Sequence, residues 1–167
     1  MVVRRPPRRL PRPRRPVGLG ALRPAAGRHP LNAASLEARA AAALAIPLQE
    51  ALGARPADPA APTAGLLFPV RGLAINPGGT LHAGALGAIL ELQGFLTLLP
   101  ELADDEHAVT HHISTQLLSP GQRDEEVLVT AVLERRTRRL GFVSATATVG
   151  DRLVARSQIT KSVIAVR

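Results

Sequence analysis

A single carboxylate interrupts the most apolar segment of the chain. Residues 76–99 read NPGGTLHAGALGAILELQGFLTLL, and Glu91 is the one acid among them. An enclosed carboxylate costs several kcal/mol unless it is hydrogen-bonded or borders a water-filled cleft. Glu91 is therefore a candidate general base or nucleophile. The alternatives are a glutamate at a solvent-reaching helix end, or one satisfied by an amide such as Gln93 or by a hydroxyl.

The residues before the apolar run could bind a developing oxyanion. Gly78 and Gly79 allow close approach of a substrate to the backbone, and the first turn of a helix has free N–H groups and a partial positive charge. The amides of Ala83 and Gly84 are candidate donors to an alkoxide, while Asn76 could orient a water or a carbonyl. A pair of glycines before a helix is a weak signal by itself.

The elements that position these groups follow from composition and spacing. Residues 35–54 are rich in alanine and predict one helix with Ser35 as N-cap, or two helices divided near Pro47. The short apolar run GLLFPV at 65–70 predicts a first strand. Residues 83–98 predict an apolar helix that ends before the next proline.

The second half of the chain predicts a sheet. From about residue 108, four β-branched runs separated by turn signals predict four strands joined by short turns, with a two-residue hairpin at Gly150-Asp151. Short connections imply an antiparallel sheet, which needs an apolar cover on one face. We therefore expect an α+β fold in which helix 83–98 lies buried across the concave face of a curved antiparallel sheet, joined by the strand that precedes it.

The glycine loop and the acid together resemble a known signature. Hot-dog fold acyl-CoA thioesterases of the phenylacetate-pathway (PaaI-like) branch carry N-x-x-G-x-x-H-G-G, followed at a fixed spacing by Asp or Glu. Asn76, Gly79, His82, Gly84 and Glu91 fall in register with that pattern. The resemblance implies an acyl-CoA thioesterase with no metal or redox cofactor. It also implies a homodimer or tetramer with active sites at the dimer interface.

The resemblance covers about residues 47–165 and departs from the family pattern at two positions. Ala83 stands where the family usually has the first glycine of a pair, and Glu91 replaces the commoner aspartate. Thr110 matches a hydroxyl position of the family, which implies a hydrogen bond to the catalytic carboxylate; an ordinary strand residue is the alternative. His82 is expected to anchor the loop rather than to transfer protons.

Helix geometry separates the acid from the glycine loop. His82 and Glu91 are nine positions apart, which in a helix means a rise of about 13.5 Å and a rotation of about half a turn. The two cannot meet within one chain, so a second subunit must supply one of them across a twofold axis. Glu91 would act as general base toward water, the role we favour, or as a nucleophile through a mixed anhydride.

Net charge divides the chain into a basic tail and a near-neutral body. Residues 1–30 hold nine of the 21 basic residues and no acid, leaving 12 basic against 13 acidic residues beyond them. Arginine and proline predict a disordered tail over 1–30, followed by a helical segment at 31–55 and a hot-dog domain at 56–167. Phosphate binding by the tail is the alternative, although we expect no nucleic-acid partner.

Composition also bears on the compartment. The chain has no cysteine, which excludes a disulfide framework and thiolate metal sites and suits a cytoplasmic protein. The longest apolar run, residues 83–99, contains Glu91 and Gln93 and suits a buried core helix better than a membrane span.

Two clusters of titratable residues have competing interpretations. A basic turn is either a solvated hairpin tip or a site for the phosphates of coenzyme A, with Arg138 and Arg139 as substrate-binding candidates; it consists of Arg135, Arg136, Arg138 and Arg139. The histidines 107, 111 and 112 suggest a metal site. However, His111 and His112 are strand neighbours that point to opposite faces, so we expect no metal there.

Other functions stay open at this point. A hot-dog module that binds acyl groups without catalysis would keep the scaffold but would not need a carboxylate at position 91. Hot-dog dehydratases are a further alternative, although the motif resembles theirs less.

Overall fold

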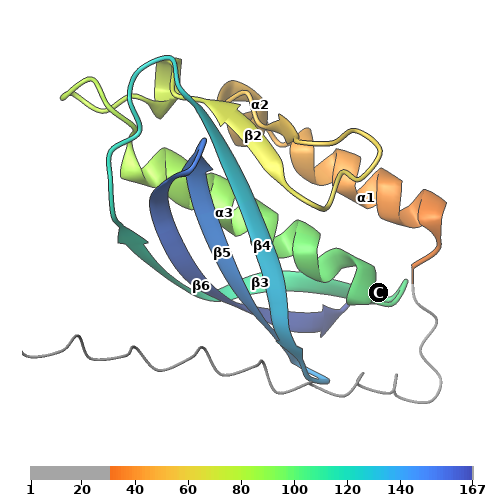
Figure 1. Ribbon diagram of the computed structural model, residues 1–167. Helices are drawn as coiled ribbons and strands as arrows, with labels where there is room; N and C mark the ends of the chain where they lie inside the picture. Colours follow the sequence, from red (N-terminus) through yellow and green to blue (C-terminus); the bar gives the residue numbers. More distant parts are fainter. Residues whose placement is uncertain (1–30, 167) are drawn as a thin grey trace, which may run out of the picture.

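Helix α3, Ala83–Leu98, is the centre of the computed structural model, which describes residues 31–166. A six-stranded antiparallel sheet curls around this helix (Figure 1). Its strands are β1 Arg55–Pro56, β2 Leu66–Pro69, β3 Glu106–Leu117, β4 Glu126–Arg136, β5 Leu140–Val149 and β6 Arg152–Ala165. The predicted α+β architecture, a curved antiparallel sheet wrapped around a buried helix, is confirmed.

The order of the strands corrects one expectation. The sheet runs β1-β2-β4-β5-β6-β3, so β4, β5 and β6 are joined by hairpins as predicted, whereas β3 pairs with β6 and not with its chain neighbour β4. Residues 118–125 are therefore a crossover rather than a hairpin turn. As a result β3 is an edge strand, paired along one side only among the described residues.

The composition of α3 explains its place in the core. Ten of its 16 residues are buried, and the helix ends where Leu99–Glu101 tightens into a short 3₁₀ turn (η2) containing a proline. Gly94 lets the helix approach β6, because a Cβ there would lie 2.9 Å from Cδ1 of Ile159. Gly141 on β5 does the same for the far end of the helix, at Leu98.

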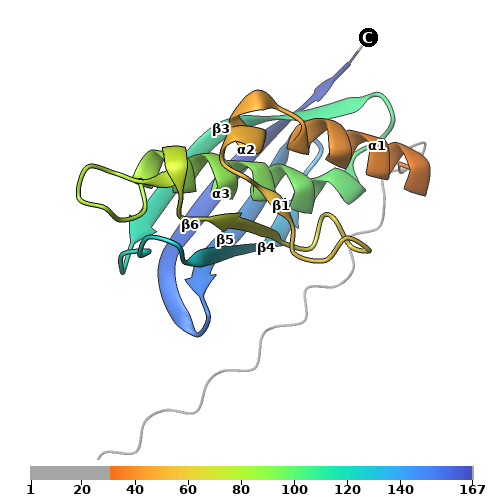
Figure 2. The same cartoon turned by 90° about the horizontal axis from the view of Figure 1, so that it is seen from above.

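Two helices precede the sheet and pack alongside α3 (Figure 2). They are α1 Ala33–Leu44 and α2 Pro47–Ala51, so the division near Pro47 is confirmed. The predicted N-cap is wrong, because Asn32 accepts a hydrogen bond from the Ser35 N–H and caps α1 three residues earlier. Ala40 and Leu52 belong to the hydrophobic core of the whole fold.

Three further features complete the path of the chain. A 3₁₀ turn, η1 Gly72–Ala74, lies between β2 and α3, and the two-residue strand β1 was not predicted. The predicted disordered tail, residues 1–30, lies outside the described residues. Within residues 31–166 one helix, Ala83–Glu101, is long and apolar enough to cross a membrane by length and composition, and most of it is buried in the protein.

Candidate active site

Glu91 is held by two side chains from the sheet. Thr110 on β3 donates its hydroxyl hydrogen to Glu91 Oε1, and the ammonium of Lys161 on β6 donates to the same oxygen. Lys161 Nζ also donates to Thr110 Oγ1 at 2.9 Å, which closes a triangle of hydrogen bonds. Because Thr110 and Lys161 are directly opposite each other in the β3–β6 ladder, the sheet itself sets this arrangement.

Glu91 is partly open to solvent, whereas its partner Lys161 is buried. The side chain of Glu91 is 37% exposed, whereas that of Lys161 is 1% exposed. Thr110 is exposed as well, along with most of the edge strand that carries it. In a single chain the site is therefore closed toward the core and open along β3.

Lys161 was not among the residues predicted from the sequence. Burial alternates along this part of β6, where Ser157, Ile159, Lys161 and Val163 point inward. A lysine in phase with Ile159 and Val163 is the signal that could have found it. Burial lowers the pKa of Lys161 from its ordinary value, and the neighbouring Glu91 carboxylate partly opposes that shift.

Gln93 does not satisfy Glu91. It is fully buried and donates instead to the backbone oxygen of Thr63 at 2.9 Å and to Thr97 Oγ1 at 3.0 Å. Of the two predicted kinds of partner for Glu91, an amide or a hydroxyl, the structure contains the hydroxyl, that of Thr110.

A cavity of about 430 Å³ lies beside Glu91. Its walls come from α1, α2, α3 and β3, and it is lined by Arg39, Ala42, Ala43, Ile46, Gln49, Glu91, Leu92, Phe95, His107 and Ala108. The rings of Phe95 and His107 are tilted against each other with centroids 5.4 Å apart. Burial, and then the positive charges of Arg39 and Lys161, lower the pKa of His107. The cavity thus offers an apolar wall next to a carboxylate.

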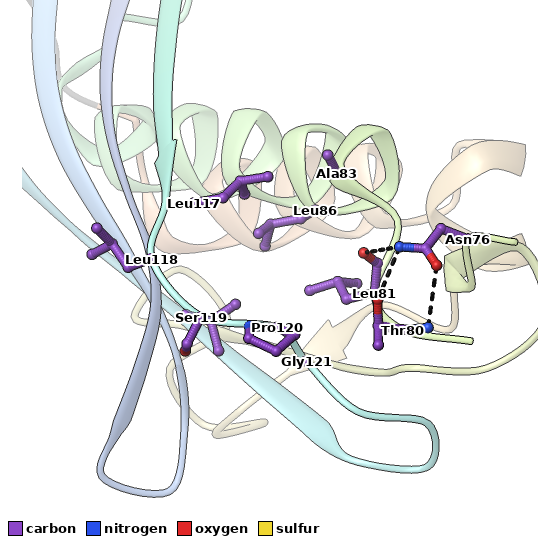
Figure 3. A pocket seen from close by; sticks show the side chains of 11 residues that line it. Asn76, Thr80, Leu81, Ala83, Leu86, Leu117, Leu118, Ser119, Pro120 and Gly121 are labelled. Carbon is purple, nitrogen blue, oxygen red and sulfur yellow. Dashed lines mark hydrogen bonds between the residues drawn. The ribbon is translucent and has the colours of Figure 1, made fainter. Parts of the chain in front are cut away.

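Asn76 organises the glycine loop. Its Oδ1 accepts from the Gly78 N–H at 2.8 Å. Oδ1 also accepts from the Thr80 N–H at 3.2 Å, and Nδ2 donates to Thr80 Oγ1 at 2.9 Å and to the Leu81 carbonyl at 3.2 Å (Figure 3). The loop turns at Gly79, whose φ of +79° favours glycine. All the polar atoms of the Asn76 side chain are therefore engaged within the loop.

His82 caps the N-terminus of α3. The ring atom Nδ1 accepts from the Gly84 N–H at 2.9 Å. The backbone N–H of His82 donates to the Ala74 carbonyl at 2.8 Å. A Cβ on Gly84 would lie 3.1 Å from the imidazole, so the absence of a side chain at position 84 leaves room for the ring. The N–H of Ala83, at the first helical position, has no partner within the helix. Of the two predicted amide donors, only that of Ala83 is left available by the cap.

A second cavity, of about 350 Å³, lies at this end of the helix (Figure 3). The loop contributes Asn76, Thr80 and Leu81, the helix contributes Ala83 and Leu86, and residues 117–121 with Val154 form the opposite wall. Glu91 borders the first cavity and Ala83 the second. Eight residues separate them, about 12 Å along the helix, so the acid and the amide of one chain lie in different cavities.

The remaining predicted residues lie elsewhere. Arg138 and Arg139 are exposed at the β4–β5 tip, close to the C-terminal end of α3 and thus far from the glycine loop of the same chain. His111 contacts Ser162 Oγ at 3.1 Å, and the β3–β6 register shifts between Thr110 and His112. Residues 31–166 contain no group of three or more His, Asp or Glu side chains arranged to hold a metal ion.

Comparison with known proteins agrees with this fold. Residues 78–155 match the family model of the thioesterase superfamily, and the antiparallel sheet curled around a central helix is the hot-dog fold. The matched range spans the positions of Gly79, His82, Gly84, Glu91 and Thr110 and begins after Asn76. No curated protein sequence matches the chain significantly.

Solved structures share the fold at low sequence identity. A thioesterase from Haemophilus influenzae is 21% identical with a TM-score of 0.66, the alignment covering 83% of this chain and 94% of that one. A Bacillus halodurans protein solved with CoA is 16% identical, with a TM-score of 0.65 and coverages of 77% and 88%. A putative thioesterase from Ralstonia eutropha, described as phenylacetic acid degradation-related, is 24% identical, with a TM-score of 0.64 and coverages of 76% and 98%.

Proposed function

We propose that this protein hydrolyses an acyl-CoA or related thioester to a free acid and CoA. One observation carries the proposal: the only acid of the central helix is fixed by a hydroxyl and an ammonium at the edge of a largely apolar cavity. The match of residues 78–155 to the thioesterase superfamily model supports the reaction class. A neighbour of the same fold that was solved with CoA supports CoA as the carrier of the acyl group.

The active unit in this proposal is a homodimer formed through β3. Nine of the twelve residues of this edge strand are exposed, among them the apolar side chains of Val109, Ile113 and Leu117. Such an edge strand has unpaired N–H and C=O groups along one side, which are a template for pairing with another chain. Antiparallel pairing of two β3 strands about a twofold axis also makes the two α3 helices antiparallel, so that the N-terminus of each approaches the middle of the other. Two such dimers could associate further as a tetramer.

The chemistry then needs groups from both copies. Glu91 takes a proton from water while the water oxygen bonds to the thioester carbonyl carbon, and the N–H of the second copy's Ala83 donates to the developing oxyanion. Collapse of this intermediate breaks the C–S bond, and the proton passes from Glu91 to the departing thiolate. In the nucleophilic variant, Glu91 itself bonds to that carbon, and the C–S bond breaks to release the CoA thiolate. Water then cleaves the resulting anhydride, its hydroxyl going to the acyl group and its proton to the thiolate.

The loop residues act in this scheme by holding the amide donor. Asn76 keeps the turn folded through its four hydrogen bonds, and His82 fixes the first turn of the helix. The acyl group occupies the cavity beside Glu91. Arg138 and Arg139 bind phosphates of CoA from the β4–β5 tip, which antiparallel pairing would bring toward the glycine loop of the other copy.

A non-catalytic module that only binds acyl groups is the second candidate, since the cavity alone would serve it. Glu91→Gln separates the two, because Gln keeps an acceptor for Thr110 and Lys161 but cannot take a proton. We expect turnover, measured as free-thiol release over a panel of acyl-CoA substrates, to fall about 10²- to 10⁴-fold with the dimer intact. Glu101→Gln, an exposed acid beyond the same helix, is the matched control. Wild-type protein that binds acyl-CoA without releasing thiol would establish the binding module instead.

A further inference from the structure

We propose that Lys161 is a positioning residue for Glu91: it fixes Oε1 in the anionic carboxylate, so that Oε2 is the oxygen presented to the substrate. The inference rests on the proposed thioesterase function and adds a residue to it. Lys161 does not itself contact the reacting atoms in this scheme; it acts through Glu91.

The hydrogen bonds assign different roles to the two oxygens of Glu91. Oε1 accepts from both Lys161 Nζ and Thr110 Oγ1, whereas Oε2 has no hydrogen-bond partner among the described residues. Two donors on one oxygen restrict rotation of the carboxylate, and a charged donor makes one of these bonds strong. Oε2 is therefore the oxygen free to take a proton from water or to attack a carbonyl carbon.

The placement of Lys161 is hard to explain by stability alone. Its side chain is almost fully enclosed at an inward position of β6, in phase with Ile159 and Val163. Replacing a buried ion pair by apolar residues is often neutral or stabilising. The ammonium also lies 5.9 Å from the centre of the Phe95 ring, which borders the cavity beside Glu91. An ammonium here is instead suited to hold one carboxylate in a fixed orientation.

The charges around the ammonium predict its pH response. Glu91 on α3 is its direct partner, while His107 on β3 and Arg39 on α1 are the other titratable groups on this side of the fold. Burial lowers the pKa of Lys161, so the ammonium is lost at a lower pH than an ordinary lysine would allow. Its loss releases Oε1, and turnover should then fall on the alkaline side.

The test is Lys161→Met in two backgrounds, wild type and Glu91→Gln. Methionine fills a similar volume without charge. In the wild-type background we expect kcat to fall about 10- to 100-fold, the range of a lost charge-assisted hydrogen bond, with KM changed less than about twofold. In the Glu91→Gln background we expect no further loss, because the carboxylate that Lys161 positions is already gone. Lys161→Arg should recover part of kcat.

Two results would overturn the proposal: wild-type kcat in Lys161→Met, or the same fractional loss in both backgrounds, which would indicate a general structural role. If Lys161→Met does not fold, Lys161→Gln is used with the same pair of outcomes. A titration of the Lys161 ammonium by NMR requires no activity. Glu91→Gln should lower the pKa of Lys161 further, and an unchanged pKa would contradict the pairing. If wild-type protein hydrolyses no thioester, the proposed function fails, while this titration still tests the pair.

Discussion

Gly94→Ala tests how closely α3 must approach the sheet for Glu91 to reach its partners. Gly94 lies one helical turn after Glu91, and Ile159 lies two residues before Lys161 on the same inward side of β6. A Cβ at position 94 would lie 2.9 Å from Ile159 Cδ1 and 3.2 Å from its Cγ2. Ile159 is itself 1% exposed, so it has little room to give way.

The magnitude follows from two opposing terms. Alanine in place of glycine inside a helix stabilises by about 1 kcal/mol. Overpacking of a filled core costs about 1–3 kcal/mol. Gly87→Ala on the same helix is the matched variant, because a Cβ there meets nothing within 4 Å and only the first term applies. The two variants should therefore differ by about 1–3 kcal/mol in the free energy of unfolding.

Thermal unfolding at one protein concentration measures this difference. At about 2–4 °C for each kcal/mol in a chain of this size, Gly94→Ala should melt about 2–12 °C below Gly87→Ala. We also expect a lower kcat for Gly94→Ala, because the helix must shift relative to Lys161. If Gly94→Ala is as stable as Gly87→Ala, the close approach of α3 to β6 does not constrain the site and this reasoning is refuted.

Three further predictions concern the loop, the basic tip and the cavity. Asn76→Ala should lower kcat about tenfold through disorder of the loop, with KM less affected; a loss equal to that of Glu91→Gln would give Asn76 a direct chemical role. Replacing Arg138 and Arg139 by alanine should raise KM for acyl-CoA about 5- to 20-fold at low salt. Arg123→Ala, in an exposed turn, is the control and should leave KM unchanged. Equal effects on KM would mean that the arginines attract CoA only through non-specific charge. His107 has a lowered pKa in the folded state, so its protonation favours unfolding, and stability should fall as the pH drops through the ordinary histidine range. The melting temperature should therefore depend less on pH between 7 and 5 for His107→Phe than for the wild type. Equal dependence on pH in the two proteins would exclude this contribution.

The main elements of the fold could be predicted because their local sequence signals are strong. Continuous apolar character marks the helix at 83–98, and β-branched runs between turn signals mark the strands after it, which the structure reproduces within a few residues. The pairing of β3 with β6 could not be predicted, since a crossover and a hairpin leave similar turn residues between strands. The capping error at Ser35 has a similar origin, because Asn32 is an equally good cap.

The site was partly accessible from the sequence. The spacing between the glycine loop and Glu91 requires their separation within one chain, and the structure leaves them in different cavities. Lys161 was missed because a single lysine in a strand usually lies on the solvent face, and only the burial phase of β6 reveals it. The engagement of Asn76 within its own loop depends on φ and ψ angles that residue types do not specify. The tail at 1–30 and the cytoplasmic location stay predictions.

Complementation between two inactive variants tests the shared site most directly. Ala83→Pro removes the proposed amide donor while suiting the first position of a helix, and His82 before it already has the extended backbone that proline requires. Glu91→Gln removes the acid. Each variant alone should hydrolyse thioesters poorly.

When the two variants are denatured together and refolded in equal amounts, half of the dimers are mixed and each mixed dimer has one intact site. We therefore predict recovery of about a quarter of wild-type turnover. Activity no greater than the average of the two separate variants, in a preparation shown by mass spectrometry to contain mixed dimers, would contradict a site built from two chains.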